Sequence, residues 1–135
     1  MTSTDRTRTS RTTARRAMGG ALAAIGIGHF VAPQGFEAIV PDELPAKRAL
    51  VYGSGVAEIG LGAALALRPS RRVAWAIVAL LVAVFPANVN MAVRDIQIPG
   101  APAVPRWAAW ARLPLQAVMI WAVLAVTRPT ADDAR

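Results

Sequence analysis

Four apolar stretches fill most of this 135-residue chain, and each is close to the length that crosses a bilayer. They cover residues 17–32, 49–67, 73–92 and 107–127. A membrane-spanning helix needs about 20 mostly apolar residues, because its backbone amides must be hydrogen-bonded within the segment where water is absent. The pattern predicts an all-α fold, a polytopic membrane protein whose four transmembrane helices form one bundle.

The composition indicates a single membrane domain. Hydrophobic residues make up 55% of the chain and the mean hydropathy is +0.41, which is too apolar for a soluble domain of this size. We expect a disordered basic cytoplasmic tail over residues 1–16, the transmembrane domain over 17–127 and a short cytoplasmic tail over 128–135. No small-residue cleavage site follows the first apolar stretch, which predicts that this helix is retained.

The positive charge is distributed as a topology signal. The net charge is +7, but the basic residues lie outside the apolar stretches or at their ends, which does not predict nucleic-acid binding. Ten of the 15 Lys and Arg residues fall in the N-terminal segment, the turn at 68–72 and the C-terminal segment. The positive-inside rule therefore predicts that both termini are cytoplasmic.

The two segments predicted on the outer side differ in character. Segment 33–45 is bounded by prolines and mixes apolar with acidic residues, which favours a short interfacial helix. Segment 94–106 carries three prolines and a glycine, which disfavours regular structure. The turn at 68–72 is short and makes its two flanking helices antiparallel.

Small residues at four-residue spacing predict which helix faces meet. Membrane helices approach closely where side chains are small. Gly20, Ala24 and Gly28 share one face of the first predicted helix. In the second, Ser54, Glu58 and Gly62 share a face, and we expect that face to look into the bundle.

Polar side chains from all four predicted helices fall at a similar depth, in the outer half of the membrane. These candidate pocket residues are His29, Tyr52, Ser54, Glu58, Asn88, Arg112 and Gln116. An ionisable group inside a spanning helix costs a few kcal/mol or more unless it is paired, so we expect Glu58 and Arg112 to pair, most simply with each other. Two interpretations stay open: a structural polar network, or a site for a ligand or a proton.

Several kinds of chemistry find no support in the sequence. Cysteine is absent, which excludes disulfides and thiol redox chemistry within this chain. The single histidine makes no metal-ligand set, and we find no nucleophile motif or Gly-rich phosphate loop. We expect no metal site and no catalytic activity of its own, and the residues define no catalytic group. Pro86 is expected to kink its helix and to free the carbonyl of Val82.

Several motifs taken together resemble the DoxX-like family of small four-helix integral membrane proteins of bacteria. They are Gly28-His29-Phe30, Leu50-Val51-Tyr52, Phe85-Pro86-Ala87-Asn88 and Arg112-Leu113-Pro114-Leu115-Gln116. The resemblance implies a multi-pass protein of the bacterial cytoplasmic (inner) membrane, surrounded by lipid, whose family is named after a subunit of quinone-linked oxidation systems. A shared fold does not transfer a reaction.

This resemblance leads to one functional expectation and two alternatives. We expect an accessory subunit or membrane partner of a redox or detoxification system, with the polar cluster near a quinone- or lipid-sized pocket and a redox enzyme as partner. The first alternative is a membrane enzyme or carrier for a small hydrophobic molecule. The second is a bundle in which the polar residues form only structural pairs.

Overall fold

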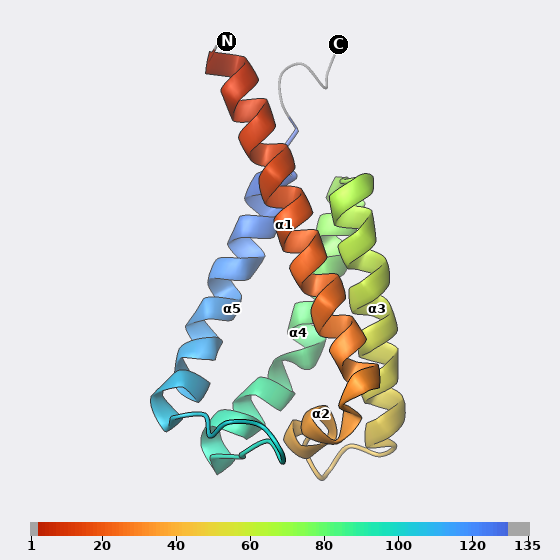
Figure 1. Ribbon diagram of the computed structural model, residues 1–135, viewed down its shortest axis with the longest axis vertical. Helices are drawn as coiled ribbons and strands as arrows, with labels where there is room; N and C mark the ends of the chain where they lie inside the picture. Colours follow the sequence, from red (N-terminus) through yellow and green to blue (C-terminus); the bar gives the residue numbers. More distant parts are fainter. Residues whose placement is uncertain (1–2, 130–135) are drawn as a thin grey trace.

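The computed structural model describes residues 3–129, and within them the chain is helical without strands. Its five helices are α1 (Ser3–Val31), α2 (Pro33–Ile39), α3 (Lys47–Leu67), α4 (Arg71–Arg94) and α5 (Arg106–Val126). The four long helices run lengthwise, and the start of α1 and the end of α5 lie at the end of the molecule opposite α2 (Figure 1). The prediction of an all-α fold is confirmed. Most of the expected tail at 128–135 lies outside the described residues.

Three helices, α3, α4 and α5, are long and apolar enough to cross a membrane. The helix α1 does not meet the same criteria, because arginines occupy its first half and its apolar part begins at Ala17. That part, residues 17–31, is about 22 Å long at 1.5 Å per residue, whereas the hydrocarbon core of a bilayer is about 30 Å thick. The expectation of four spanning helices therefore depends on α1.

The N-terminal segment differs from the expected disordered tail, because α1 is helical from Ser3 onwards. Two of its arginines find partners on the last helix of the chain. Arg11 donates to the carbonyl oxygen of Ala125 at 3.1 Å, and Arg15 donates to that of Val126 at 2.7 Å. The last carbonyls of a helix lack partners within the helix and carry partial negative charge, so cations near them are stabilising.

The tightest helix contact joins α1 to α3, where two pairs of glycines face each other. A Cβ atom at Gly26 would lie 2.6 Å from the carbonyl oxygen of Gly55, and one at Gly62 would lie 2.5 Å from that of Gly19. Side chains at these four positions would push the helices apart. The glycines therefore set the distance between α1 and α3.

The small-residue spacing predicted that the face of α1 with Gly20 packs on a neighbouring helix, and this prediction is wrong, because the face that packs begins one residue earlier, at Gly19. Gly20 is exposed with open space around it, while Gly19 and Gly26 are buried against α3. On α3 the expected face does look inward, since Glu58 and Gly62 are buried. Small residues occur on more than one side of α1, so their spacing alone does not identify the side that packs.

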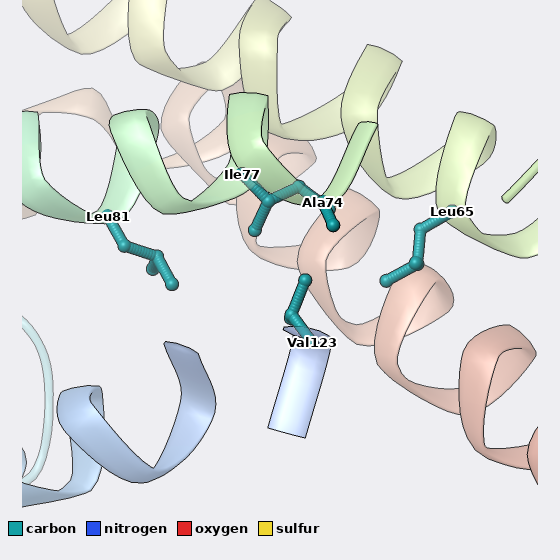
Figure 2. Packing of buried hydrophobic residues seen from close by; sticks show 5 residues of the cluster. All are labelled: Leu65, Ala74, Ile77, Leu81 and Val123. Atoms are coloured by element: carbon teal, nitrogen blue, oxygen red, sulfur yellow. The ribbon is translucent and has the colours of Figure 1, made fainter. Parts of the chain in front are cut away.

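Apolar side chains fill the half of the bundle nearest the termini, which we call the closed half. Its core comprises Leu65 from α3, Ala74, Ile77 and Leu81 from α4, and Val123 from α5. Figure 2 shows Val123 of α5 pointing toward Ala74 and Ile77 of α4. Leu65, Ala74 and Ile77 are each at most 1% exposed. This half is packed like the interior of a globular protein.

The opposite end of the bundle is covered by α2 and the segment at residues 95–105. The predicted short helix is present and begins at Pro33. Segment 95–105 has no helix, as predicted, and Gln97 closes it by accepting from the backbone N–H of Val104 at 2.8 Å. A Cβ atom at Gly35 would lie 2.7 Å from the Ile98 side chain, so α2 packs directly on this segment.

Candidate functional site

A cavity of about 500 Å³ lies in the half of the bundle next to α2, which we call the hollow half. All five helices contribute to its wall. Most of the lining side chains are apolar, among them Leu22, Phe36, Leu80, Val84 and Met119. Six of the seven candidate residues also line it: His29, Ser54, Glu58, Asn88, Arg112 and Gln116. The structure thus places these polar groups around a single apolar hollow.

Tyr52, the seventh candidate, lies away from the cavity. Its ring stacks on Phe30, with 5.1 Å between the ring centroids and 7° between the planes. This contact joins α1 to α3 on another side of their interface. Tyr52 was expected in the cluster because of its depth in the bundle, but it faces a different direction from Glu58 on α3.

His29 and Glu58 lie together in the wall of the cavity, where α1 and α3 are held close by Gly26 and Gly55. The two side chains belong to residues that are 5% and 6% exposed. His29 Nδ1 lies 3.4 Å from Glu58 Oε2 and 2.9 Å from the carbonyl oxygen of Ile25. Because a carbonyl oxygen can only accept, the shorter contact places a proton on Nδ1 and directs it to the backbone.

The ring of His29 is held by a second element. It stacks on Phe36 of α2, with 3.8 Å between the ring centroids and 24° between the planes. Together with the Ile25 carbonyl, this contact fixes the orientation of the imidazole. In a neutral ring protonated at Nδ1, the other nitrogen, Nε2, is a hydrogen-bond acceptor.

One oxygen of Glu58 is left without a hydrogen bond. Among the described residues, Oε2 has no donor within hydrogen-bonding geometry, although the atom is buried. An unsatisfied buried polar group costs roughly 1–3 kcal/mol. The wall of an otherwise apolar cavity therefore carries a carboxyl oxygen whose hydrogen-bonding capacity is unused.

The expected ion pair between Glu58 and Arg112 does not form. Within residues 3–129, Arg112 makes no ion pair, and its Nη1 lies 3.6 Å from the sulfur of Met91. Arg112 is exposed, so water or lipid headgroups can solvate its charge. The cavity separates the two groups that the sequence led us to pair, and the neighbour of Glu58 is His29.

Gln116 and Asn88 form a hydrogen-bonded chain between α5 and α4. Asn88 Nδ2 donates to Gln116 Oε1 at 2.9 Å, and Gln116 Nε2 donates to the backbone oxygen of Leu81 at 2.7 Å. Gln116 also borders a smaller hollow of about 260 Å³ between the same helices. The sequence predicted that Pro86 frees the carbonyl of Val82. The carbonyl that accepts a side-chain hydrogen bond in this turn is instead that of Leu81, and the donor is the amide of Gln116.

Charged groups hold the segment between α2 and α3 in place at the end of the cavity. Lys47 lies 2.6 Å from Asp42, and Arg94 contacts both Asp42 at 3.1 Å and Glu43 at 3.2 Å. The hydrogen bond and charge of Lys47, assisted by Arg94, lower the pKa of Asp42 below 3.8. Asn90 ties α4 to α2 by donating to the Ile39 carbonyl at 3.0 Å.

The apolar wall and the role of α2 were missed in the sequence. Phe36 was assigned to an interfacial helix, and Met119 to the interior of a spanning helix, without a connection between them. A stacked aromatic ring over His29 has no periodic signature, because the contact joins separate helices. The motif Gly28-His29-Phe30 followed by Phe36 was the one available signal.

The arrangement suits binding better than a defined reaction. A cavity of this size is in the range that holds small ligands, and a few polar groups in an apolar wall fix a ligand's orientation. Glu58 can accept from a hydroxyl group, and Arg112 can donate to a carbonyl or an anion. Among the described residues, no three side chains of His, Cys, Asp or Glu gather as metal ligands.

Comparison with known proteins gives one match. Neither a curated protein nor a solved structure matches the chain. The family model described as a domain of unknown function, DUF8561, matches residues 18–127, which include α2 to α5 and the apolar part of α1. The matched range thus contains the whole cavity and all seven candidate residues. The chain belongs to the DUF8561 family.

Proposed function

We propose that this protein is a four-helix bundle of the bacterial inner membrane with both termini in the cytoplasm. The apolarity of α3, α4 and α5 supports membrane insertion. The glycine contact between α1 and α3 supports α1 as the fourth spanning helix. The two helices pack closely side by side, and α3 is itself long and apolar enough to cross a membrane. The ten arginines of segments 1–16, 68–72 and 128–135 support the orientation, because basic residues accumulate on the cytoplasmic side of a membrane protein.

Within that bundle, the cavity binds a small hydrophobic molecule that carries a carbonyl or hydroxyl group, of the size and polarity of a quinone headgroup. The single observation that carries this proposal is the buried Glu58 oxygen that accepts no hydrogen bond from the described residues, in an apolar cavity of about 500 Å³. A hydroxyl group of the ligand would satisfy Glu58, and Arg112 would meet a carbonyl oxygen. The apolar wall would exclude strongly hydrated molecules.

The resemblance to DoxX-like proteins adds a biological setting to this proposal. In that setting the protein is an accessory subunit that presents or receives a membrane-soluble molecule for a redox or detoxification enzyme. We assign no reaction to the chain itself. Purification from its native membrane in mild detergent tests the setting: a co-purifying oxidoreductase supports it, and a chain that is isolated alone counts against it.

Ligand binding is tested with a short-tailed ubiquinone analogue, titrated into the purified full-length chain in detergent. We expect saturable quenching of tryptophan fluorescence and a rise in melting temperature. Glu58→Gln and Arg112→Gln should each weaken binding about tenfold, consistent with one lost hydrogen bond to a charged group of ~1.5 kcal/mol.

Tyr52→Phe is the matched control, because this residue lies at a comparable depth on α3 but outside the cavity. It should bind the analogue like the unchanged chain. Equal weakening in Tyr52→Phe and Glu58→Gln would refute the cavity as the binding site. Absence of saturable binding would favour the second alternative named in the sequence analysis, a bundle with purely structural polar pairs.

The orientation is tested separately with reporter fusions at the C-terminus and at Gly100. We expect the C-terminal fusion to report the cytoplasm and the Gly100 fusion to report the opposite side. A C-terminal reporter that is active only outside would overturn the orientation.

A further inference from the structure

Three arginines from two helices surround the last turn of α5. Arg11 and Arg15 of α1 donate to the carbonyls of Ala125 and Val126, and Arg71 of α4 donates to that of Leu124 at 3.1 Å. The three acceptors are consecutive, so the guanidinium groups converge on one helix end. We call these three residues the arginine cap.

Among the described residues, the arginine cap has more donors than acceptors. Each guanidinium has five N–H groups, and the contacts with α5 use Nη2 of Arg11, Nε of Arg15 and Nη1 of Arg71. The three side chains are half-buried and held by fixed acceptors. A guanidinium that is already oriented loses less conformational freedom when it binds an anion bidentately.

Positive charge is in excess in the segments that form this end of the molecule. Among the described side chains of residues 6–129, none of the cap arginines pairs with an acidic group, and neither do the exposed Arg68 and Arg72 nearby in sequence. At the opposite end, by contrast, Lys47, Arg48 and Arg94 all pair with acidic side chains. In the sequence, segments 1–16, 68–72 and 128–135 carry ten arginines against three aspartates, so positive charge remains in excess there.

Apolar surface lies beside these charges. Trp75, one turn along α4, is 55% exposed, and Arg71 lies over its ring at 5.7 Å. Leu67, at the end of α3, is 78% exposed. A partner must therefore offer an anion next to hydrocarbon, which a nucleic acid or a free phosphate does not.

We propose that the arginine cap, with Arg68 and Arg72, binds the phosphodiester headgroup of an anionic phospholipid whose acyl chains lie along Trp75 and Leu67. This inference rests on the membrane placement proposed above and is independent of the ligand in the cavity. Basic residues at a helix end next to a bilayer attract anionic lipids, and the fixed guanidinium groups add geometric selectivity.

The test titrates the full-length chain in neutral detergent with phosphatidylglycerol or with phosphatidylcholine of the same acyl chains, and counts bound lipid by native mass spectrometry. We expect phosphatidylglycerol to bind at least tenfold more tightly. Arg72→Gln and Arg68→Gln should each weaken it about fivefold. These exposed residues donate no hydrogen bond to α5 among the described residues, so we expect their variants to keep the fold, whereas Arg71→Gln removes both a hydrogen bond to α5 and a cap donor.

Arg106→Gln is the matched control, because Arg106 is an exposed, unpaired arginine at the other end of the bundle. It should bind phosphatidylglycerol like the unchanged chain. Equal binding of both lipids, or equal weakening by Arg106→Gln, would refute the site. Displacement of the lipid by inorganic phosphate at equal concentration would assign the site to a free anion. Recovery of the chain from the soluble fraction would refute the membrane placement and this inference together, whereas failure of quinone binding would leave the lipid result unaffected.

Discussion

The closed half and the hollow half use the same long helices and differ in what fills the space between them. In the closed half, Leu65, Ile77 and Val123 are buried in one apolar cluster contributed by α3, α4 and α5. In the hollow half, polar side chains and a cavity occupy the corresponding space, and both Pro86 and Pro114 fall there. Dense packing stabilises, whereas a cavity forgoes contacts. The difference teaches that stability and binding are separated along the bundle axis.

The most direct way to break this comparison is to truncate one leucine in each half. Leu65→Ala should lower the free energy of unfolding by about 2–5 kcal/mol, because its side chain is 1% exposed and leaves a void. Leu80→Ala should cost less than half as much, because that side chain already borders the cavity. Melting in detergent measures both. Equal losses would mean that the cavity is filled in the folded protein.

We expect the next largest loss of stability when the hydrogen-bonded chain of Asn88, Gln116 and the Leu81 carbonyl is broken. Gln116→Leu leaves the Leu81 oxygen and the Asn88 amide without their partners, which should cost roughly 1–3 kcal/mol for each unsatisfied group. Glu58→Gln, in the hollow half, removes no hydrogen bond and should change the melting temperature little. A larger loss for Glu58→Gln than for Gln116→Leu would contradict the assignment of Gln116 to structure and Glu58 to binding.

The glycine contact between α1 and α3 runs through both halves and can be tested in the hollow one. Gly26→Ala should destabilise by about 1–3 kcal/mol, because its Cβ would meet the Gly55 backbone and force the helices apart. Gly20→Ala, on the open side of α1, should be neutral or slightly stabilising. If the two alanine variants melt at the same temperature, the glycines do not set the distance between the helices.

A double-mutant cycle sharpens the description of the cavity. Because Glu58 and Arg112 do not touch, the effects of Glu58→Gln and Arg112→Gln on unfolding should add within ~0.5 kcal/mol. Glu58→Gln and His29→Gln should not add, since Nδ1 of His29 lies 3.4 Å from the carboxyl. The free energies of unfolding of the single and double variants measure this coupling. Coupling between Glu58 and Arg112 would support the ion pair that the sequence suggested and contradict the separation of the two groups by the cavity.

The smallest expected effect concerns the ion pairs that cover the hollow half. Since the pKa of Asp42 is lowered in the folded protein by Lys47 and then by Arg94, its contribution to stability is present above pH 3.8. It is lost as the pH falls through the lower folded-state value. The difference in melting temperature between the unchanged chain and Asp42→Asn should therefore be small at pH 7 and should shrink as the pH falls below 3.8. A difference that grows on acidification would contradict the sign.

The helices of the fold were predictable from the sequence, because long apolar runs and proline-bounded segments have strong local signatures. The positions of α2 and of the irregular segment 95–105 follow from proline alone. The helical start of α1 was not predictable, because its support comes from carbonyls at the other end of the chain. The inward face of α1 was also missed. Gly19 and Gly20 are adjacent residues of the same type, and only their contacts distinguish them: Gly19 packs against α3, whereas Gly20 has open space around it.

The candidate residues were predictable as a group but not as pairs. Depth along each helix brings His29, Glu58, Arg112 and Gln116 to one level, and the structure has all of them around one cavity. Which of them meet depends on the rotation of each helix about its axis. A rotation of 100° per residue sends neighbours such as Tyr52 and Ser54 to different surroundings. Sequence spacing within one helix does not fix that rotation.

The contacts of Arg11 and Arg15 with α5 have a consequence for how the chain is made. Arg11 and its acceptor are 114 residues apart in sequence, so the first helix finds this partner only after the last one has been synthesised. The pair α1 and α3, by contrast, can associate as soon as α3 leaves the ribosome. Assembly of the bundle should thus begin with the glycine-paired hairpin of α1 and α3, and the end of α5 then completes it by accepting hydrogen bonds from Arg11 and Arg15 of α1.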